Sequence, residues 1–393
     1  MQPIKVLHSF GSLNIGGIET WLMNIIRQKS DEIKFDFVLR DSGGALEEEV
    51  KGYGCKIYYY PHCSRLQKYL NSFGLGNRFD SLRGILLGDN YDAFHIHGEE
   101  FMGDAVRVAA SVKVPVRIVH CHGTVLCRGR KGLEIALRGV RFKTIDRQLI
   151  LRYATDIVVC SNEAGRFLVG NHWKTDPRCC LFYCGVPLDQ FKAVSTKWAS
   201  RQEFRQAHNI PADALVIGHI GSMGLAPVKN HFFLLDIFAQ LARRNQRYLL
   251  YLVGDGPLRP EIIQAVKARG LENRVLIPGL CNDISSLMVH GFDIFILPSL
   301  GEGLPIAGLE AVASGLYTIC SDTITADFTN YFRERVMTVS LSASASHWAD
   351  LVEEAFGRRI NLNLALDLVE KSPFSITSSL YNLINFYKQS LQG

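Results

Sequence analysis

Residues 295–312 read FILPSLGEGLPIAGLEAV, and this stretch predicts a strand, a glycine-containing loop and a helix in succession. Its first letters are continuously apolar, which suits a strand that is buried on both faces. Pro305 follows the glycines, at a place where the first turn of a helix tolerates proline. The start of a helix offers unpaired N–H groups and partial positive charge. The stretch therefore predicts an α/β fold with an anion site behind a strand.

The same alternation of strand and helix continues in both directions, which predicts parallel sheets with right-handed crossovers. In the first half, the expected strands are 4–10, 35–40, 56–61, 94–98, 116–123, 156–161 and 180–186, and the expected helices are 18–29, 101–111 and 134–152. In the second half, the expected strands are 215–222, 248–256, 274–280, 292–299 and 317–322, and the expected helices are 231–243, 258–269, 282–290 and 305–314.

A polar stretch at 187–200 separates the two series. We therefore expect two doubly wound, Rossmann-like domains, 1–190 and 191–371. Residues 372–393 are expected to form a terminal helix that packs back toward the first domain. Ligands of such folds bind beyond the carboxyl ends of the strands, here in a cleft between the domains.

The composition is typical of a soluble globular protein. The chain has 393 residues, of which 47% are hydrophobic, and suits two or three domains. No apolar run reaches the ~18 residues that a membrane span needs, and the first ten residues lack a signal-peptide pattern. Most of the ten cysteines fall in strand-like runs, as do Cys121, Cys160 and Cys320, and none forms C-x-x-C. Buried thiols of this kind indicate a reducing compartment, so we expect a cytoplasmic protein.

Positive charge is concentrated in one segment. Residues 1–190 hold 25 Lys and Arg against 20 Asp and Glu, and eight basic residues with two acidic ones lie in 128–152. Interleaved apolar residues would let this segment lie on an anionic membrane surface through Arg138, Arg141 and Lys143. The alternative is a solvated helix that packs on its own domain. No nucleic-acid-binding motif accompanies the charge, so we expect no nucleic-acid partner.

Two glutamates in the opening stretch stand eight positions apart. Glu302 lies in the expected loop and Glu310 in the second turn of the expected helix. A carboxylate that points into a cleft accepts hydrogen bonds from a diol, which suits ribose or hexose hydroxyls. On spacing alone, a helix-capping glutamate and an exposed one are the alternative.

The wider set of motifs resembles family 4 retaining glycosyltransferases, which have the GT-B fold of two Rossmann-like domains facing across a cleft. The motifs are E-x7-E, SLNIGGIETWLMNII, RIVHCHGT, CSNEAGRFL, VKNHFFLLDIF, LVGDGPLRPEI and SDTIT, in that family's order and over nearly the whole chain. They most resemble the branch that builds bacterial capsular and exopolysaccharides. The resemblance implies that 1–190 binds the acceptor and 191–371 binds a nucleotide-sugar donor.

The resemblance also implies roles for single residues. Glu310 would hold the ribose hydroxyls of the donor, and Glu302 would contact hydroxyls of the transferred sugar. His122, at the end of a strand, would contact the donor sugar as well. The diphosphate would lie near the backbone at the helix start, formed by Gly303, Leu304, Ile306 and Ala307.

Gly16 and Gly17 follow the first expected strand. Glycine lets the backbone approach a phosphate closely, although a plain turn is the alternative. In the family this loop faces the diphosphate. Glu19, just inside the next helix, either reaches the acceptor or favours the helix dipole.

A metal is not expected. A zinc site from His120, His122 and Cys127 is conceivable, but its spacing matches no standard ligand set. The chain also lacks Asp-x-Asp, the metal-diphosphate motif of the other large glycosyltransferase fold. We therefore expect no metal and no cofactor besides the donor substrate.

The segment HIGSMGLAPVKNH departs from the family pattern. Lys229 and Asn230 are present, but Ser222 stands where the family has an arginine on the donor diphosphate. A cation there offsets charge on the leaving group. Either another basic residue substitutes, or Lys229 and the helix dipole suffice, or the protein binds a donor without turning it over.

The expected function is transfer of a hexose-type sugar, with retention, from a nucleotide-sugar to a lipid-linked saccharide in capsule, exopolysaccharide or O-antigen synthesis. The donor is expected to be a UDP-sugar, and the protein to be peripheral at the inner face of the cell membrane. The alternatives are a catalytically silent donor-binding subunit and a nucleotide-sugar epimerase of the same fold.

Overall fold

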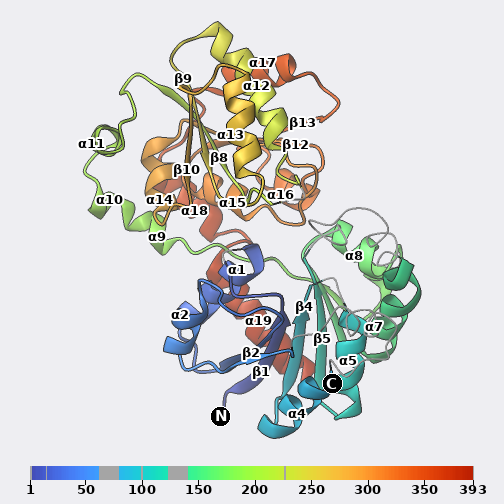
Figure 1. Cartoon of the computed structure of the whole chain (residues 1–393). Coiled ribbons are helices and arrows are strands. Elements are labelled where there is room, and N and C mark those ends of the chain that lie inside the picture. Colours follow the sequence, from blue (N-terminus) through green and yellow to red (C-terminus); the bar gives the residue numbers. More distant parts are fainter. Residues whose placement is uncertain are drawn as a thin grey trace. The chain divides into compact units, whose positions relative to one another are not determined.

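The computed structural model describes residues 2–14, 16–61, 79–98, 101–122, 140–224 and 227–392. The chain divides into two compact units, Met1–Gly185 with Ile376–Gly393, and Val186–Ser375. Each unit is built on one parallel sheet with helices packed on it (Figure 1). The expected boundaries after residues 190 and 371 lie within five residues of the observed ones.

The first unit contains a seven-stranded parallel sheet in the order β3-β2-β1-β4-β5-β6-β7. The strand order reverses between β1 and β4, which is the doubly wound arrangement. The strands are β1 (Ile4–Phe10), β2 (Ile33–Leu39), β3 (Ile57–Tyr59), β4 (Ala93–His97), β5 (Val116–Cys121), β6 (Asp156–Val159) and β7 (Cys179–Leu181). The helices are α1 (Gly17–Arg27), α2 (Glu47–Gly52), α4 (Asp80–Asp89), α5 (Met102–Ser111), η1 (Phe142–Asp146), α7 (Arg147–Tyr153), α8 (Asn162–Leu168), η2 (Trp173–Thr175) and α19 (Ile376–Ser390).

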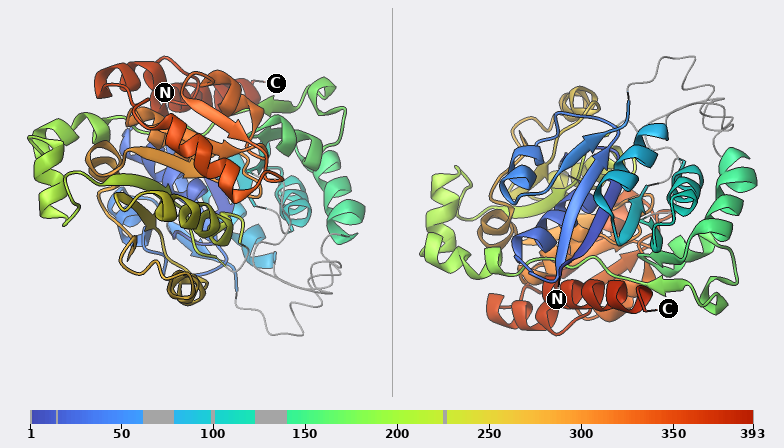
Figure 2. Two further views of the ribbon diagram at one scale, coloured as in Figure 1. Left: turned by 90° about the horizontal axis from the view of Figure 1, so that it is seen from above. Right: turned by 90° about the horizontal axis from the view of Figure 1, so that it is seen from below.

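The two faces of this first sheet differ in chemistry, because successive strand residues point to opposite faces. One face packs with α4, α5, α7 and α8 through apolar residues, among them Leu7, Phe94, Ile96 and Val119. The alternate positions carry the buried histidines His8, His95, His97 and His120. This histidine face meets Trp21 of α1 and Tyr387 of α19. Helix α19, the long red helix that ends at the C-terminus in Figure 2, therefore completes the first unit.

The second unit contains a six-stranded parallel sheet in the order β10-β9-β8-β11-β12-β13. Its strands are β8 (Leu215–Ile220), β9 (Tyr248–Val253), β10 (Val275–Gly279), β11 (Ile294–Leu297), β12 (Tyr317–Ser321) and β13 (Val336–Val339). Its helices are α9 (Asp189–Lys192), α10 (Val194–Lys197), α11 (Arg201–Ala207), α12 (His231–Arg244), α13 (Arg259–Ala268), α14 (Ile284–Ser286), η3 (Leu287–Gly291), α15 (Ile306–Ala313), α16 (Ala326–Tyr331), α17 (Ala345–Ala355) and α18 (Leu362–Glu370). Strand β13 is absent from the sequence prediction, and α9 and α10 lie where a polar linker was expected.

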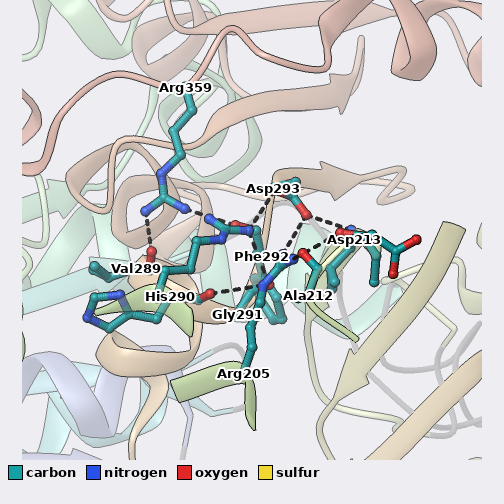
Figure 3. A network of polar contacts seen from close by, with 12 residues as sticks. Arg205, Ala212, Asp213, Val289, His290, Gly291, Phe292, Asp293 and Arg359 are labelled. Atoms are coloured by element: carbon teal, nitrogen blue, oxygen red, sulfur yellow. Dashed lines mark hydrogen bonds and ion pairs between the residues drawn. The ribbon is translucent and has the colours of Figure 1, made fainter. Parts of the chain in front are cut away.

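A network of arginines fixes α11 to the base of the second sheet (Figure 3). Arg205 Nη2 donates to Asp293 Oδ2 at 2.7 Å, and this carboxylate oxygen also accepts from the backbone N–H of Val216 at 2.7 Å. Arg359 Nη1 donates to the carbonyl of Phe292 at 2.9 Å, and burial lowers the pKa of Arg359 to about 10. These contacts lie at the amino ends of β8 and β11. The carboxyl ends of the strands therefore carry the loops that remain available to a ligand.

Candidate active site

An ion pair joins two loops at the carboxyl edge of the second sheet. Lys229 Nζ lies 2.8 Å from Glu302 Oε2. The other carboxylate oxygen, Oε1, accepts a hydrogen bond from Ser299 Oγ at 2.6 Å. The Lys229 and Glu302 side chains are 20% and 10% exposed. Because both oxygens of Glu302 have a partner, its carboxylate has a fixed orientation.

Hydroxyl groups from the SDTIT motif hold the glutamate loop in place. The carbonyl of Ser299 accepts from Ser321 Oγ at 2.6 Å and from Thr323 Oγ1 at 2.7 Å. Glu302 also forms an isolated parallel bridge with Ile324. The sequence prediction assigns no role to these two hydroxyls, although SDTIT is among the motifs that carry the family resemblance.

Helix α15 begins after this loop with no side-chain cap. The Ile306 N–H donates to the Leu304 carbonyl at 3.1 Å, so this amide, expected near the diphosphate, already has a partner inside the loop. The Ala307 N–H belongs to the first turn, which has no intrahelical acceptors, and Gly303 is buried in the preceding loop. Glu310, one turn further on, is partly buried, and its burial raises the pKa of the carboxyl to about 7.

Two glycines of the loop after β9 pack closely on the loop after β8. A Cβ on Gly254 would lie 2.0 Å from the carbonyl oxygen of Gly221, and one on Gly256 would lie 2.4 Å from that of Met223. Both glycines have positive φ, 141° and 151°. Only glycine permits this backbone conformation and approach together. Ser222 lies between Gly221 and Met223, so these glycine contacts fix its backbone. Its side chain is exposed.

Two buried histidines lie beside Lys229 but supply no positive charge. The rings of His219 and His231 are 5.1 Å apart. Burial, and then the charge of Lys229, lower the pKa of His231 to about 4, and burial lowers that of His219 well below its usual value. Both imidazoles are neutral near pH 7 and do not replace the arginine expected at Ser222. Asn230, between Lys229 and His231 in the chain, is the N-cap of α12 and has the left-handed conformation.

In the first unit, Gly16 is the N-cap of α1 and Gly17 its first residue. A Cβ on Gly16 would lie 2.4 Å from Glu19 Oε2, so the Glu19 carboxylate lies over the helix start. This position favours an interaction with the positive end of the helix. Contact of Glu19 with an acceptor stays a prediction.

His122 follows β5 and is partly exposed. Its Nε2 lies 2.8 Å from His97 Nδ1, and its Nδ1 lies 3.9 Å from Cys184 Sγ. His120, on the same strand face, is fully buried. Cys127, the third ligand of the zinc site considered from the sequence, lies outside the described residues. His97, which the sequence prediction passed over, is instead the neighbour of both histidines.

The three membrane-surface candidates have different outcomes. Arg138 lies outside the described residues. Arg141 is only 10% exposed and pairs with Asp104 and Asp146, so the expectation of a surface cation at Arg141 is wrong. Lys143 is exposed. Within the described part of the chain, no helix is both long and apolar enough to cross a bilayer.

Comparison with known proteins bears on the family. A profile described as Glycosyltransferase Family 4 matches residues 15–190, and one described as Glycosyl transferases group 1 matches residues 214–354. The putative glycosyltransferase EpsF of Bacillus subtilis is 34% identical over 360 residues, which are 89% of this chain and 87% of EpsF. The chain belongs to glycosyltransferase family 4. The family and the enzyme class predicted from the motifs are thereby confirmed.

Further comparisons give this family 4 glycosyltransferase two more relatives and a solved structure. The capsular polysaccharide biosynthesis glycosyltransferase CapH of Staphylococcus aureus is 24% identical over 92% of this chain and 93% of CapH. The UDP-Gal:alpha-D-GlcNAc-diphosphoundecaprenol alpha-1,3-galactosyltransferase of Escherichia coli is 25% identical over 62% of this chain and 60% of that enzyme. The structure of Anabaena Alr3699/HepE in complex with UDP matches with a TM-score of 0.75 at 16% identity, over 98% of this chain and 100% of HepE. The GT-B fold predicted from the motifs is confirmed.

Proposed function

We propose that the chain transfers a hexose from a UDP-sugar to a lipid-linked saccharide with retention at the anomeric carbon. The observation that carries the proposal is the Lys229–Glu302 pair beside the start of α15. A cation and a helix start stabilise a departing diphosphate, and a neighbouring carboxylate accepts hydrogen bonds from sugar hydroxyls. The name of the E. coli relative, with UDP-Gal and a diphosphoundecaprenol-linked acceptor, supports both substrate classes.

Donor binding changes the partner of Lys229. A diphosphate carries more negative charge than one carboxylate, so it competes with Glu302 for Lys229 Nζ. Glu302 Oε2 is then available to a sugar hydroxyl, while Ser299 keeps Oε1 in place. Glu310 accepts ribose hydroxyls best when ionised, so donor affinity rises as the pH increases through about 7, the pKa of this carboxyl.

The test is donor binding by calorimetry together with release of nucleoside diphosphate, over a panel of UDP-, GDP- and ADP-sugars. Release is measured with and without a lipid-linked saccharide. We expect binding and release with one UDP-sugar, and weakening of both by Glu310→Ala. The exposed Glu272→Ala variant is the matched control and should behave as the parent chain. Absence of binding to every donor would overturn the proposal.

Ser222 favours a second candidate function, a donor-binding subunit that does not turn the donor over. The two buried histidines beside Lys229 are neutral near pH 7 and do not replace the expected arginine. This second function predicts that the parent chain binds a donor but releases no nucleoside diphosphate when acceptor is present. It also predicts that Ser222→Arg introduces this release. Release by the parent chain excludes it.

A lipid-linked acceptor lies at a membrane surface, and we propose that the protein associates with this surface peripherally. Exposed Lys143 lies between the exposed apolar residues Val140 and Ile145, which suits an anionic lipid surface. Binding to liposomes that contain anionic lipid should weaken in Lys143→Glu. Unchanged binding would leave this segment as a solvated face.

A further inference from the structure

Five histidines follow one face of the first sheet. They are His8 on β1, His95 and His97 on β4, His120 on β5 and His122 just after β5. Each His-x-His pair places two imidazoles on the same side of a strand. The register of β4 and β5 sets His97 directly opposite His120. The rings of His120 and His122 are stacked with their centroids 3.8 Å apart.

Three of these imidazoles have an acceptor for one ring N–H. His97 Nε2 lies 2.9 Å from His8 Nδ1, and His120 Nδ1 lies 3.2 Å from His95 Nε2. His122 Nδ1 lies 3.9 Å from Cys184 Sγ. Tyr387 Oη, 2.7 Å from His95 Nδ1, anchors the chain of contacts on α19. A proton on each of the three nitrogens leaves the opposite nitrogen of each ring with a lone pair.

The nitrogens opposite these N–H groups are His97 Nδ1, His120 Nε2 and His122 Nε2. His97 Nδ1 and His122 Nε2 lie 2.8 Å apart, and one nitrogen of each of the three residues lies within 4.8 Å of one nitrogen of each of the others. His120 Nε2 is buried and has no hydrogen-bond partner among the described residues.

We propose that His97, His120 and His122 bind one divalent transition-metal ion, of which zinc is the usual ion with three histidine ligands. The ion takes the place of the hydrogen bond in which His97 Nδ1–H donates to His122 Nε2. The His97 proton then lies on Nε2 and is donated to His8 Nδ1, and the single proton of His8 moves from its Nδ1 to its Nε2. Each ligand ring then donates its other N–H to a fixed acceptor, as histidine ligands do in metal sites. The partly exposed His122 gives the ion a path from solvent.

The second cluster, His8, His95 and His97, is a weaker candidate for the ion. All three residues are buried, and two of them serve as hydrogen-bond acceptors for the proposed ligands. The His120–His122–Cys127 set considered from the sequence includes no ligand from the neighbouring strand β4. The sheet supplies this ligand as His97, 23 residues before His120 in the chain but paired with it across β4 and β5.

The test is titration of the chelator-treated full chain with Co²⁺, without any donor. We expect the visible absorption of tetrahedral Co²⁺ to saturate at one ion per chain and to disappear on addition of Zn²⁺. His122→Ala should lose this absorption, because it removes the partly exposed ligand. His172→Ala removes an exposed histidine elsewhere in the first unit and should leave the absorption unchanged.

A second variant tests the outer contact. Cys184→Ala keeps all three ligands but removes the acceptor of His122, and we expect about tenfold weaker Co²⁺ binding. Circular dichroism of each variant establishes that it is folded. Absence of saturable absorption in the parent chain, or equal absorption in folded His122→Ala, would overturn the proposal. Because no donor is present, neither result depends on the transferase proposal.

Discussion

The two sheets carry their ionisable groups in different places. In the second unit, Lys229 and Glu302 stand in loops beyond the strand ends, and each keeps some exposure to solvent. In the first unit, buried histidines stand on the strands themselves. A strand-end loop can keep a charged pair because water or a ligand replaces a lost partner. On a buried sheet face an ionised side chain without a partner is very costly, so the histidines there are neutral and form contacts with one another.

The largest effect that we predict from this difference is loss of stability of the first unit in acid. Burial lowers the pKa of His8 to about 3 and those of His95, His97 and His120 well below 6.5. Such groups bind protons only after unfolding, so their contribution to stability is complete above about pH 6.5 and decreases as the pH falls toward the folded pKa. Each contributes up to about 1.4 kcal/mol per pH unit, so the first unit should lose several kcal/mol between pH 7 and pH 5.

The second unit provides the internal control for this prediction. Its buried histidines His219 and His231 also lower stability as the pH falls. Glu310 raises stability as the pH falls, because burial raises its pKa to about 7. Hydrogen exchange in urea, corrected for intrinsic rates, should show the first unit opening before the second at pH 5. Equal loss of protection in the two units would contradict the comparison.

The next largest effect is expected at the strand-end pair. Lys229→Ala removes the described cation beside the proposed diphosphate site, and we expect nucleoside diphosphate release to fall about 100-fold or more in kcat. Lys229→Arg keeps the charge and should retain part of the activity. If both variants release diphosphate at the parent rate, Lys229 acts only as a partner for Glu302.

A smaller effect is expected at the serine that orients Glu302. Ser299→Ala removes the hydrogen bond to Oε1, which is worth about 1.5 kcal/mol, so kcat should fall about tenfold. The change leaves Lys229 in place, and the donor Kd from calorimetry should change less than kcat. The exposed Ser195→Ala variant is the matched control. A change confined to the free energy of unfolding would assign Ser299 a structural role alone.

The sequence predicted most of both sheets because their strands are apolar runs separated by helix-length segments. It missed β13, a four-residue edge strand with one partly exposed and one exposed position. The site motifs placed Lys229 and Glu302, but the hydroxyls that hold their loop come from a different strand end. Contacts between loops depend on the register of neighbouring strands, which no local pattern reports.

The charge pattern failed at Arg141 for the same reason. The basic segment indicated a surface cation, whereas Arg141 pairs with Asp104, 37 residues earlier in the chain, and with Asp146. A count of charges along a segment does not include an acidic partner from another helix. The histidine face was likewise visible as two His-x-His motifs, but the pairing of His97 with His120 required the sheet register.

The smallest effect that we predict concerns Glu310, which combines the two environments because it lies in the helix that follows the strand-end loop and is also partly buried. Its pKa is raised to about 7, so the protonated carboxyl stabilises the fold at low pH and this stability is lost as the pH rises through about 7. Glu310→Gln carries no such penalty, so the variant should gain about 1 kcal/mol over the parent chain between pH 5 and pH 8, since partial exposure screens part of the cost. Urea unfolding of both proteins at the two pH values measures the difference. A pH-independent difference would mean that solvent screens Glu310 as fully as an exposed acid, and that burial of charge distinguishes only the histidine face of the first sheet.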